Sequence, residues 1–169
     1  NPDYNGADQE GVGYFQLTMK GGRRCSSAAA YLAPARTRKN LSIITDAQVE
    51  KVVIAEGRAT GVQIRRHQRV ETISANAEVI LSAGAIGSPQ LLMLSGIGAG
   101  GELSAHGIEV LSDLPGVGKN LQDHLQARPV FKTTLSTVNT EINSYLKKGL
   151  IAAKYAFTQR GPMTMAASL

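Results

Sequence analysis

The chain has 169 residues, of which 43% are hydrophobic and 18% charged, so it can bury a core and is not a charge-dominated disordered chain. Its net charge of +5 comes from scattered basic residues, and aromatic residues make up only 5%, which argues against nucleic-acid binding. A single cysteine excludes an internal disulfide framework, and no apolar run is long enough to predict a transmembrane segment.

The start of the chain carries no recognisable leader. It begins Asn-Pro-Asp-Tyr, without Met and without a basic segment followed by an apolar one. We therefore expect it to begin within a longer protein or after processing. The lone Cys25 fits a reducing compartment, and we assign the protein to the cytoplasm.

The N-terminal region predicts loops and short elements. Residues 14–19 predict a short strand within a Gly-, Asp- and Asn-rich loop. Ser26 or Ser27 is a favourable N-cap for a short helix through Leu32, and Pro34 is expected to stop that helix.

Short strands dominate the next part of the chain. A compact strand is predicted at residues 41–45. Three further strands with turns at Glu56-Gly57 and His67-Gln68 predict an antiparallel β-meander. These three strands cover residues 49–55, 60–66 and 69–74.

Residues 77–96 predict a strand, a turn and a helix. The apolar run 77–83 is typical of a strand buried on both faces. A glycine turn at residues 84–87 follows, with Ser88 as the N-cap of a helix that ends at Gly96. Such a turn lets a ligand approach the backbone closely, although it equally suits strand–helix packing alone.

The remaining elements follow in chain order. We expect a second helix at 101–106 and a strand at 108–111. The loop at 115–125 is the expected domain boundary. A strand at 130–135 and a helix at 141–158 follow, the latter from apolar residues at helical spacing.

Long motifs in this chain resemble a known family. The stretch from Gly84 to Gly98 reads GAIGSPQLLMLSGIG, and the stretch from Leu114 to His124 reads LPGVGKNLQDH. Upstream, Gly22-Arg23-Arg24-Cys25-Ser26 leads into Ala30-Tyr31-Leu32. Together these segments resemble the glucose-methanol-choline (GMC) oxidoreductases over nearly the whole chain.

The resemblance implies an α/β fold and an FAD-dependent enzyme that oxidises a small-molecule alcohol by hydride transfer to the flavin. Residues 1–119 would form the central part of an FAD-binding, Rossmann-like domain with a β-meander. Residues 120–169 would begin an α+β substrate domain.

Several residues match family positions near the cofactor. The backbone of Val49 matches the position that pairs with the adenine edge, although a valine here also suits the meander core. The segment near the adenosine side matches four residues of this chain. These are Ser82, Ala83, Gly84 and Ala85.

The loop before the substrate domain carries Asn120, Asp123 and His124, and we favour a structural role for the histidine. Two residues further on, Gln126 stands where choline-oxidising members typically carry an acidic residue. A neutral glutamine cannot offer full charge to a quaternary ammonium, so we expect a neutral primary alcohol as substrate. The three histidines and one cysteine show no metal-site spacing.

We assign no catalytic residue to this chain. Gly96, Gly98 and Gly101 have the spacing of the family's phosphate-binding GxGxxG unit, but they follow a predicted helix rather than a strand and therefore predict a helix stop and loop. The family's catalytic histidine, which pairs with a second histidine or an asparagine, has no match in this sequence. We therefore expect the isolated chain to be inactive and to associate with itself through exposed edges. The alternative is a non-enzymatic binding module that reuses this fold segment.

Overall fold

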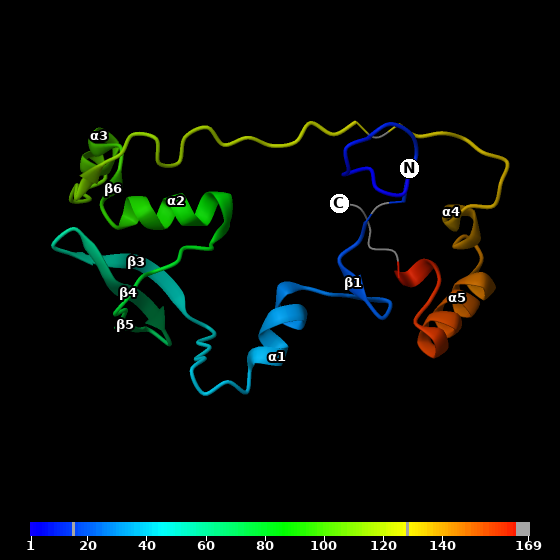
Figure 1. Cartoon of the computed structure of the whole chain (residues 1–169), viewed down its shortest axis with the longest axis horizontal. Coiled ribbons are helices and arrows are strands. Elements are labelled where there is room, and N and C mark those ends of the chain that lie inside the picture. The colour runs from blue at the N-terminus through cyan, green and yellow to red at the C-terminus, as the bar shows by residue number, and fades with distance from the viewer. Residues whose placement is uncertain (15, 128, 165–169) are drawn as a thin grey trace. The chain divides into compact units, whose positions relative to one another are not determined.

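The computed structural model describes residues 1–14, 16–127 and 129–164 and divides the chain into two compact units (Figure 1). One unit is the continuous segment Ile43–Arg128. The other combines Asn1–Ser42 with the chain from Pro129 onward.

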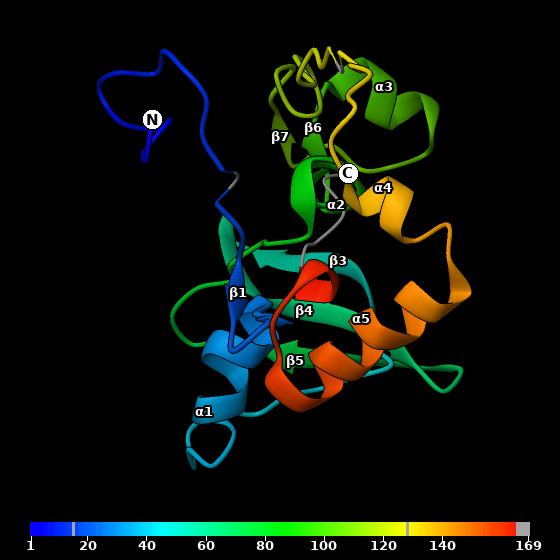
Figure 2. The same ribbon diagram turned by 90° about the vertical axis from the view of Figure 1, so that its right-hand side faces the viewer.

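The central unit contains the predicted β-meander. Strands β3 (Gln48–Ala55), β4 (Arg58–Arg66) and β5 (Arg69–Ser74) pair antiparallel in the order β3-β4-β5 and lie side by side in Figure 2. Both predicted turns are confirmed, because Ala55 faces Arg58 and Arg66 faces Arg69 across two-residue loops.

Alternation within the meander places apolar side chains on one face. Val52 pairs with Val62, and Ile64 lies two residues further along β4, so these side chains share a face. Val52 and Ile64 are 7% and 3% exposed and form part of a small core. Helix α2 packs against β3.

Helix α2 (Gly84–Leu94) begins earlier than the sequence predicted. The predicted cap, Ser88, lies inside the helix, and its Oγ accepts a hydrogen bond from the Ala83 N–H at 3.0 Å. The predicted turn at residues 84–87 is therefore the first helical turn. The predicted stop at Gly96 is confirmed, with φ at +84° and the Glu109 carbonyl 2.5 Å from where a Cβ would stand.

A small parallel pair follows α2. Strand β6 (Ile97–Gly98) pairs parallel with β7 (Ser112–Asp113), and α3 (Gly100–Ala105) lies between them in sequence. The predicted second helix is thus confirmed, while the strand expected at 108–111 lies at 112–113 instead. The backbone N–H groups of Leu111 and Ser112 both donate to the Gly96 carbonyl, which fixes the pairing at this point.

The apolar run 77–83 forms no strand, contrary to expectation. A strand exists only where a neighbouring strand completes its ladder, and none of the described residues pairs with this run. The strands expected at 41–45 and 130–135 are wrong for the same reason. Apolar composition indicated where a strand could form but not whether a partner was present.

The N-terminal part of the other unit carries β1 (Met19–Lys20) and β2 (Arg23–Arg24), which form a short antiparallel hairpin. A π-helical turn, η1 (Ala28–Leu32), continues into α1 (Ala33–Ala35). Pro34 does not stop the helical segment as predicted. It stands in the first turn of α1, directly after the π-helical turn, and the helical segment ends one residue later at Ala35.

The C-terminal part of that unit is helical. The helix expected at 141–158 is α5 (Tyr145–Thr158), which ends where predicted but begins four residues later. It begins there because the Ser144 side chain accepts from the Lys147 N–H and caps it. The short helix α4 (Val138–Glu141) precedes α5, and η2 (Pro162–Thr164) follows it. The Tyr155 hydroxyl donates to the Gly22 carbonyl at 3.2 Å and ties α5 to the β1–β2 hairpin.

Candidate functional site

The outer edge of β3 presents backbone groups away from the meander. The Val52 N–H donates to the Ser95 Oγ at 2.8 Å, so it points away from β4. The register skips Glu50, because Val49 faces Ile64 while Lys51 faces Gln63. Alternation across this β-bulge puts the backbone N–H and C=O of Val49 on the same outer edge as the Val52 N–H.

This geometry gives Val49 the groups needed to meet a planar base. An outward N–H and C=O on one residue form a donor–acceptor pair like that of a base-pairing partner. The Val49 carbonyl accepts a hydrogen bond from the Gln48 side-chain amide at 3.1 Å, and Val49 itself is only partly buried. Val49 faces the buried Ile64 across the ladder, so its side chain lies on the core face, and the alternative of a core valine is compatible with the outward backbone.

The segment Ser82–Ala85 leads into α2 and is exposed along its whole length. Gly84 has φ at +85°, and no atom lies within 4 Å of the position that its Cβ would take. The backbone there is therefore open to close approach by a ligand. None of these four side chains carries a charge, so recognition at this segment would use the backbone and shape.

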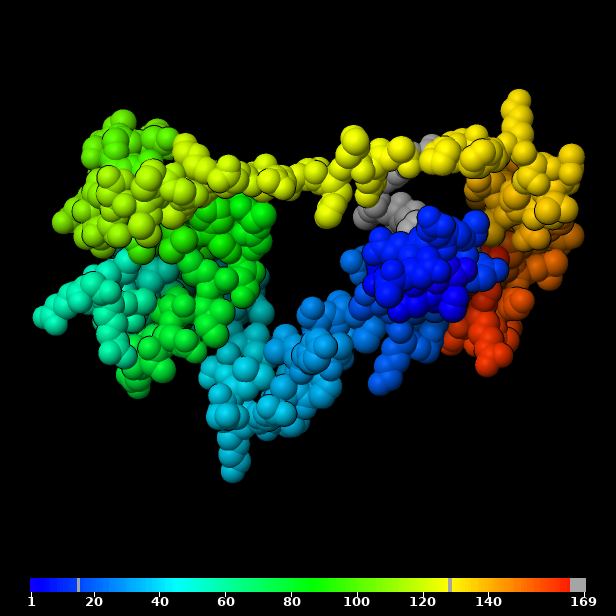
Figure 3. Space-filling model, turned by 45° about the horizontal axis from the view of Figure 1, so that its top comes forward, coloured from blue at the N-terminus to red at the C-terminus, as the bar shows by residue number. Residues whose placement is uncertain are grey.

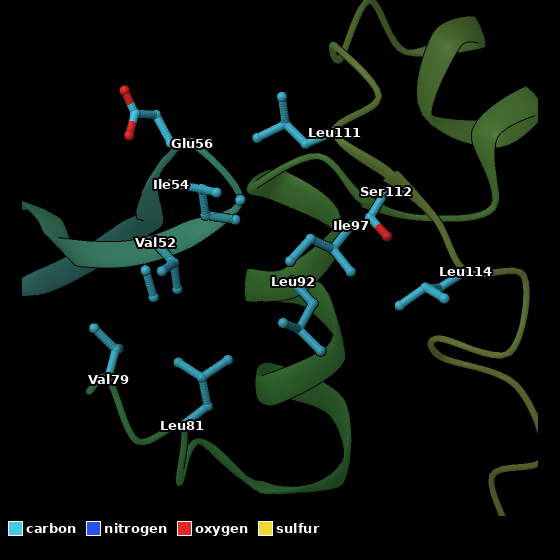
Figure 4. Close-up of a pocket in the computed structure, with 12 residues that line it drawn as sticks. Val52, Ile54, Glu56, Val79, Leu81, Leu92, Ile97, Leu111, Ser112 and Leu114 are labelled. Carbon is cyan, nitrogen blue, oxygen red and sulfur yellow. The ribbon is translucent and has the colours of Figure 1, made fainter. Parts of the chain in front are cut away.

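An apolar pocket of about 560 Å³ brings β3 and the segment before Ser82 together (Figure 4). In Figure 4 the side chains of Val52, Val79, Leu81 and Leu92 come from β3, from the segment before α2 and from α2 itself. Val52 lies three residues from Val49, and Leu81 directly precedes Ser82. The two predicted cofactor segments, Val49 and Ser82–Ala85, are therefore both close in sequence to residues that line this apolar pocket.

A second pocket, of about 640 Å³, lies between the start of α2 and the loop that follows β7. Ala85 and Asn120 both line it, so the structure places one predicted cofactor residue beside the predicted interdomain loop. Asn120 has a left-handed backbone, with φ at +56°. Gln126, the predicted substrate residue, lines neither pocket and is exposed.

The loop that carries His124 and Gln126 is extended. Figure 3 shows residues 120–127, in yellow-green to yellow, as a single thickness of chain, and all eight are exposed. The His124 N–H donates to the Asp123 carboxylate at 2.8 Å, which is a local turn contact. This contact uses the backbone of His124, so the structural role favoured for its side chain stays a prediction.

The glycine string at 96, 98 and 101 differs in detail from the prediction. A two-residue strand, β6, stands between the helix stop and α3. The Gly100 N–H, in the first turn of α3, donates to the Asp113 carboxylate at 2.9 Å. This first-turn donor is therefore satisfied within the chain.

The carboxyl group of Glu102, whose ion-pair partner Lys119 lines the second pocket, has a lowered pKa. The Lys119 ammonium lies 2.7 Å from the Glu102 carboxylate, and its hydrogen bond and positive charge lower the pKa of Glu102 below the ordinary 4.5. Both side chains are exposed. This ion pair connects α3 to the loop before Asn120.

The described residues match neither the pattern of a metal site nor that of a membrane-spanning helix. No group of three or more His, Cys, Asp or Glu side chains gathers as metal ligands would. Nor is any helix in the described ranges long and apolar enough to cross a membrane.

Ser95 is the functional candidate that sequence reasoning missed. It is 6% exposed, and its hydroxyl joins α2 to β3 through the Val52 N–H. Because the two residues are 43 positions apart, no local pattern reports this contact.

Comparison with known proteins identifies the family. The sequence model of the GMC oxidoreductase family matches residues 1–126. The chain belongs to this family, as its motifs predicted. The predicted α/β fragment is confirmed as well.

Two curated relatives are similar to this chain over nearly its whole length. The chain is 47% identical to an alcohol dehydrogenase (acceptor) of Pseudomonas putida, over 97% of this chain and 30% of the relative. It is 46% identical to an oxygen-dependent choline dehydrogenase of Rhizobium johnstonii, over 94% of this chain and 29% of the relative. The chain thus spans less than a third of the length of these relatives.

A solved structure supports both the fold and the cofactor. An FAD-dependent oxidoreductase from Chaetomium thermophilum aligns with a TM-score of 0.75 and 29% identity, over 88% of this chain and 26% of that protein. Together with the family match, this similarity confirms the prediction of FAD as the cofactor. The positions of the individual cofactor residues stay predictions.

Proposed function

We propose that the protein oxidises a primary alcohol to an aldehyde with FAD, and that this chain supplies part of the adenosine side of the cofactor site. The observation that carries the proposal is the outward-facing backbone of Val49 on the bulged edge of β3. The family match and the alcohol dehydrogenase and choline dehydrogenase relatives support the reaction class.

The reaction removes a hydride from the carbinol carbon and a proton from the hydroxyl group, and a C=O bond forms. When bound, the flavin supplies the acceptor for the hydride and its two electrons. The hydroxyl proton goes to a general base, and we assign that base to no residue of this chain. The role of this chain is to bind and orient.

The residues that would hold the adenosine half of FAD carry no charge and would bind it through backbone groups. The N–H and C=O of Val49 would pair with the adenine edge, and the Gln48 amide would leave the Val49 carbonyl to make room. The open backbone around Gly84 would lie along the ribose side, because no Cβ blocks close approach there.

The reaction is tested with the protein as its gene encodes it. Purified protein with FAD and a dye acceptor should oxidise primary alcohols across a series of chain lengths. Absence of turnover with every alcohol in the series, choline included, would overturn the proposed activity. The 169-residue chain alone should show no turnover under the same conditions.

We further propose that the substrate is a neutral alcohol, because Gln126 offers no full charge to a quaternary ammonium. Gln126→Glu should raise kcat/KM for choline relative to a neutral alcohol by about tenfold, the effect of one close charge pair partly screened by solvent. Gln122→Glu adds the same charge to the same loop and serves as the matched control. Faster turnover of choline than of neutral alcohols by the unaltered protein would contradict the proposal.

A further inference from the structure

Ser95 stands at a junction between α2 and the edge of β3. It is the one buried polar side chain among the residues that the structure describes. Its Oγ donates to the Leu91 carbonyl at 2.5 Å and accepts from the Val52 N–H at 2.8 Å. A hydroxyl has a single proton, so donation to Leu91 leaves a lone pair directed to Val52.

The Ser95 hydroxyl is the acceptor for the Val52 N–H, and neither solvent nor a neighbouring strand of the described chain is placed to replace it. Val52 is 7% exposed, so its N–H is shielded from solvent. On the outer edge of β3 it also has no strand partner within the part of the chain that the structure describes. A buried N–H without an acceptor is costly, and the strand would shift to relieve the loss.

The bulge transmits this anchoring to Val49. Val49 and Val52 are three residues apart, and in a regular strand they would face opposite edges. Because Glu50 is the extra residue of the bulge, both face the outer edge. Ser95 therefore fixes the outer edge of β3 at Val52, three residues from Val49.

We propose that Ser95 is a positioning residue, which holds the bulged edge of β3 against α2 so that the Val49 backbone meets the adenine of FAD. The inference rests on the proposed function, since it needs Val49 to contact the cofactor. Ser95 touches neither cofactor nor substrate in this proposal. Its effect passes through Val52 and the bulge.

The test compares two flavins bound by the protein as its gene encodes it. FAD carries the adenosine half, whereas FMN lacks it. Ser95→Ala should weaken FAD binding by about three- to tenfold, the factor expected for one hydrogen bond, and leave FMN binding within about twofold. Affinities are measured by flavin fluorescence quenching in titrations of the apoprotein.

Leu103→Val is the control for a purely structural loss. Leu103 is buried, at 3% exposed, but lies in α3 and outside the meander that carries Val49. This variant should lower Tm as Ser95→Ala does, without changing the ratio of FAD to FMN affinity. If Leu103→Val changes the ratio equally, general destabilisation explains the effect and the positioning role is overturned.

The outcomes separate this inference from the function on which it rests. If the unaltered protein binds FAD no more tightly than FMN, the proposed adenosine site itself fails. If it prefers FAD and Ser95→Ala preserves that preference, the site stands and the positioning role of Ser95 is wrong.

Discussion

The two hairpin turns of the meander differ in whether their second position is a glycine. The β3–β4 turn carries Glu56 and Gly57, with φ at 51° and 74°, and the β4–β5 turn carries His67 and Gln68, with φ at 46° and 67°. Two consecutive left-handed residues suit a type I′ turn, which favours glycine at its second position. The second turn lacks that glycine and holds two side chains in left-handed backbone.

We predict that Gln68→Gly stabilises the chain by about 1 kcal/mol, because it relieves one left-handed non-glycine residue. Gly57→Ala should destabilise the chain by a similar amount, about 1 kcal/mol. No atom lies within 4 Å of the position of a Cβ at Gly57, so backbone strain alone would account for that cost. Urea unfolding monitored by circular dichroism measures both changes. A loss of stability in Gln68→Gly would contradict the turn geometry.

At the scale of elements, one ion pair connects α3 to the following loop. The hydrogen bond and charge of Lys119 hold the pKa of Glu102 below its ordinary value. A depressed carboxyl pKa means that the stabilising contribution is complete above the ordinary pKa of an unfolded glutamate. It is lost as pH falls through the lower pKa of the folded state.

We predict that Lys119→Ala returns the pKa of Glu102 toward 4.5, because it removes both leading causes of the shift. Lys119→Arg keeps the charge and should keep the pKa depressed. The pKa is measured by NMR titration of the Glu102 side-chain carboxyl carbon. An unchanged titration in Lys119→Ala would show that the pair does not form in solution.

The run at 77–83 is an apolar segment without a strand partner among the described residues. Two of its side chains, Val79 and Leu81, line the apolar pocket beside β3. Alternate residues of the run thus already face the core as those of a strand would. The relatives are more than three times as long, which leaves ample chain for a partner strand.

We predict that the amides of residues 79–81 exchange rapidly in the 169-residue chain. In a protein of the relatives' length they should exchange at least about tenfold more slowly, because a neighbouring strand would pair with them. Hydrogen exchange followed by mass spectrometry measures both. The Val62 amide, in the central strand of the meander, should be protected in each case. Equal exchange at 79–81 in both proteins would exclude this strand.

Local patterns predicted the elements whose hydrogen bonds are local. The meander followed from alternating residues and two short turns, and α2 ended at Gly96 as its left-handed backbone requires. The start of α2 was missed because Ser88 resembles an N-cap in sequence, while its hydroxyl binds the Ala83 N–H from inside the helix. Strand partners lay beyond the reach of such patterns.

The candidate site also contains features that the sequence predicted and features that only the fold shows. The sequence identified Val49 and the segment Ser82–Ala85 through the resemblance of their motifs to a family. It could not predict the bulge at Glu50, which depends on the register with β4 and decides where the Val49 backbone points. The bond from Val52 to Ser95 joins two elements distant in sequence, and only the fold brings them together.

At the scale of the whole molecule, helix α5 presents an exposed apolar stripe. Leu146, Leu150 and Phe157 recur at helical spacing and are 76%, 62% and 88% exposed. Ile151 and Tyr155 lie on another side of the helix and are partly buried within their own unit. An uncovered stripe of this kind favours association in water.

We predict that the 169-residue chain associates with itself at micromolar concentration and that Leu150→Glu weakens the association by at least about tenfold, the effect of losing one buried leucine side chain. Ala152→Glu adds the same charge about 140° away from the stripe on the same exposed helix, as the α-helical period of 3.6 residues gives, and should change the association little. Sedimentation velocity over a concentration series measures both variants. A monomeric unaltered chain throughout the series would refute self-association. Equal weakening by both variants would show that charge, rather than the stripe, governs it.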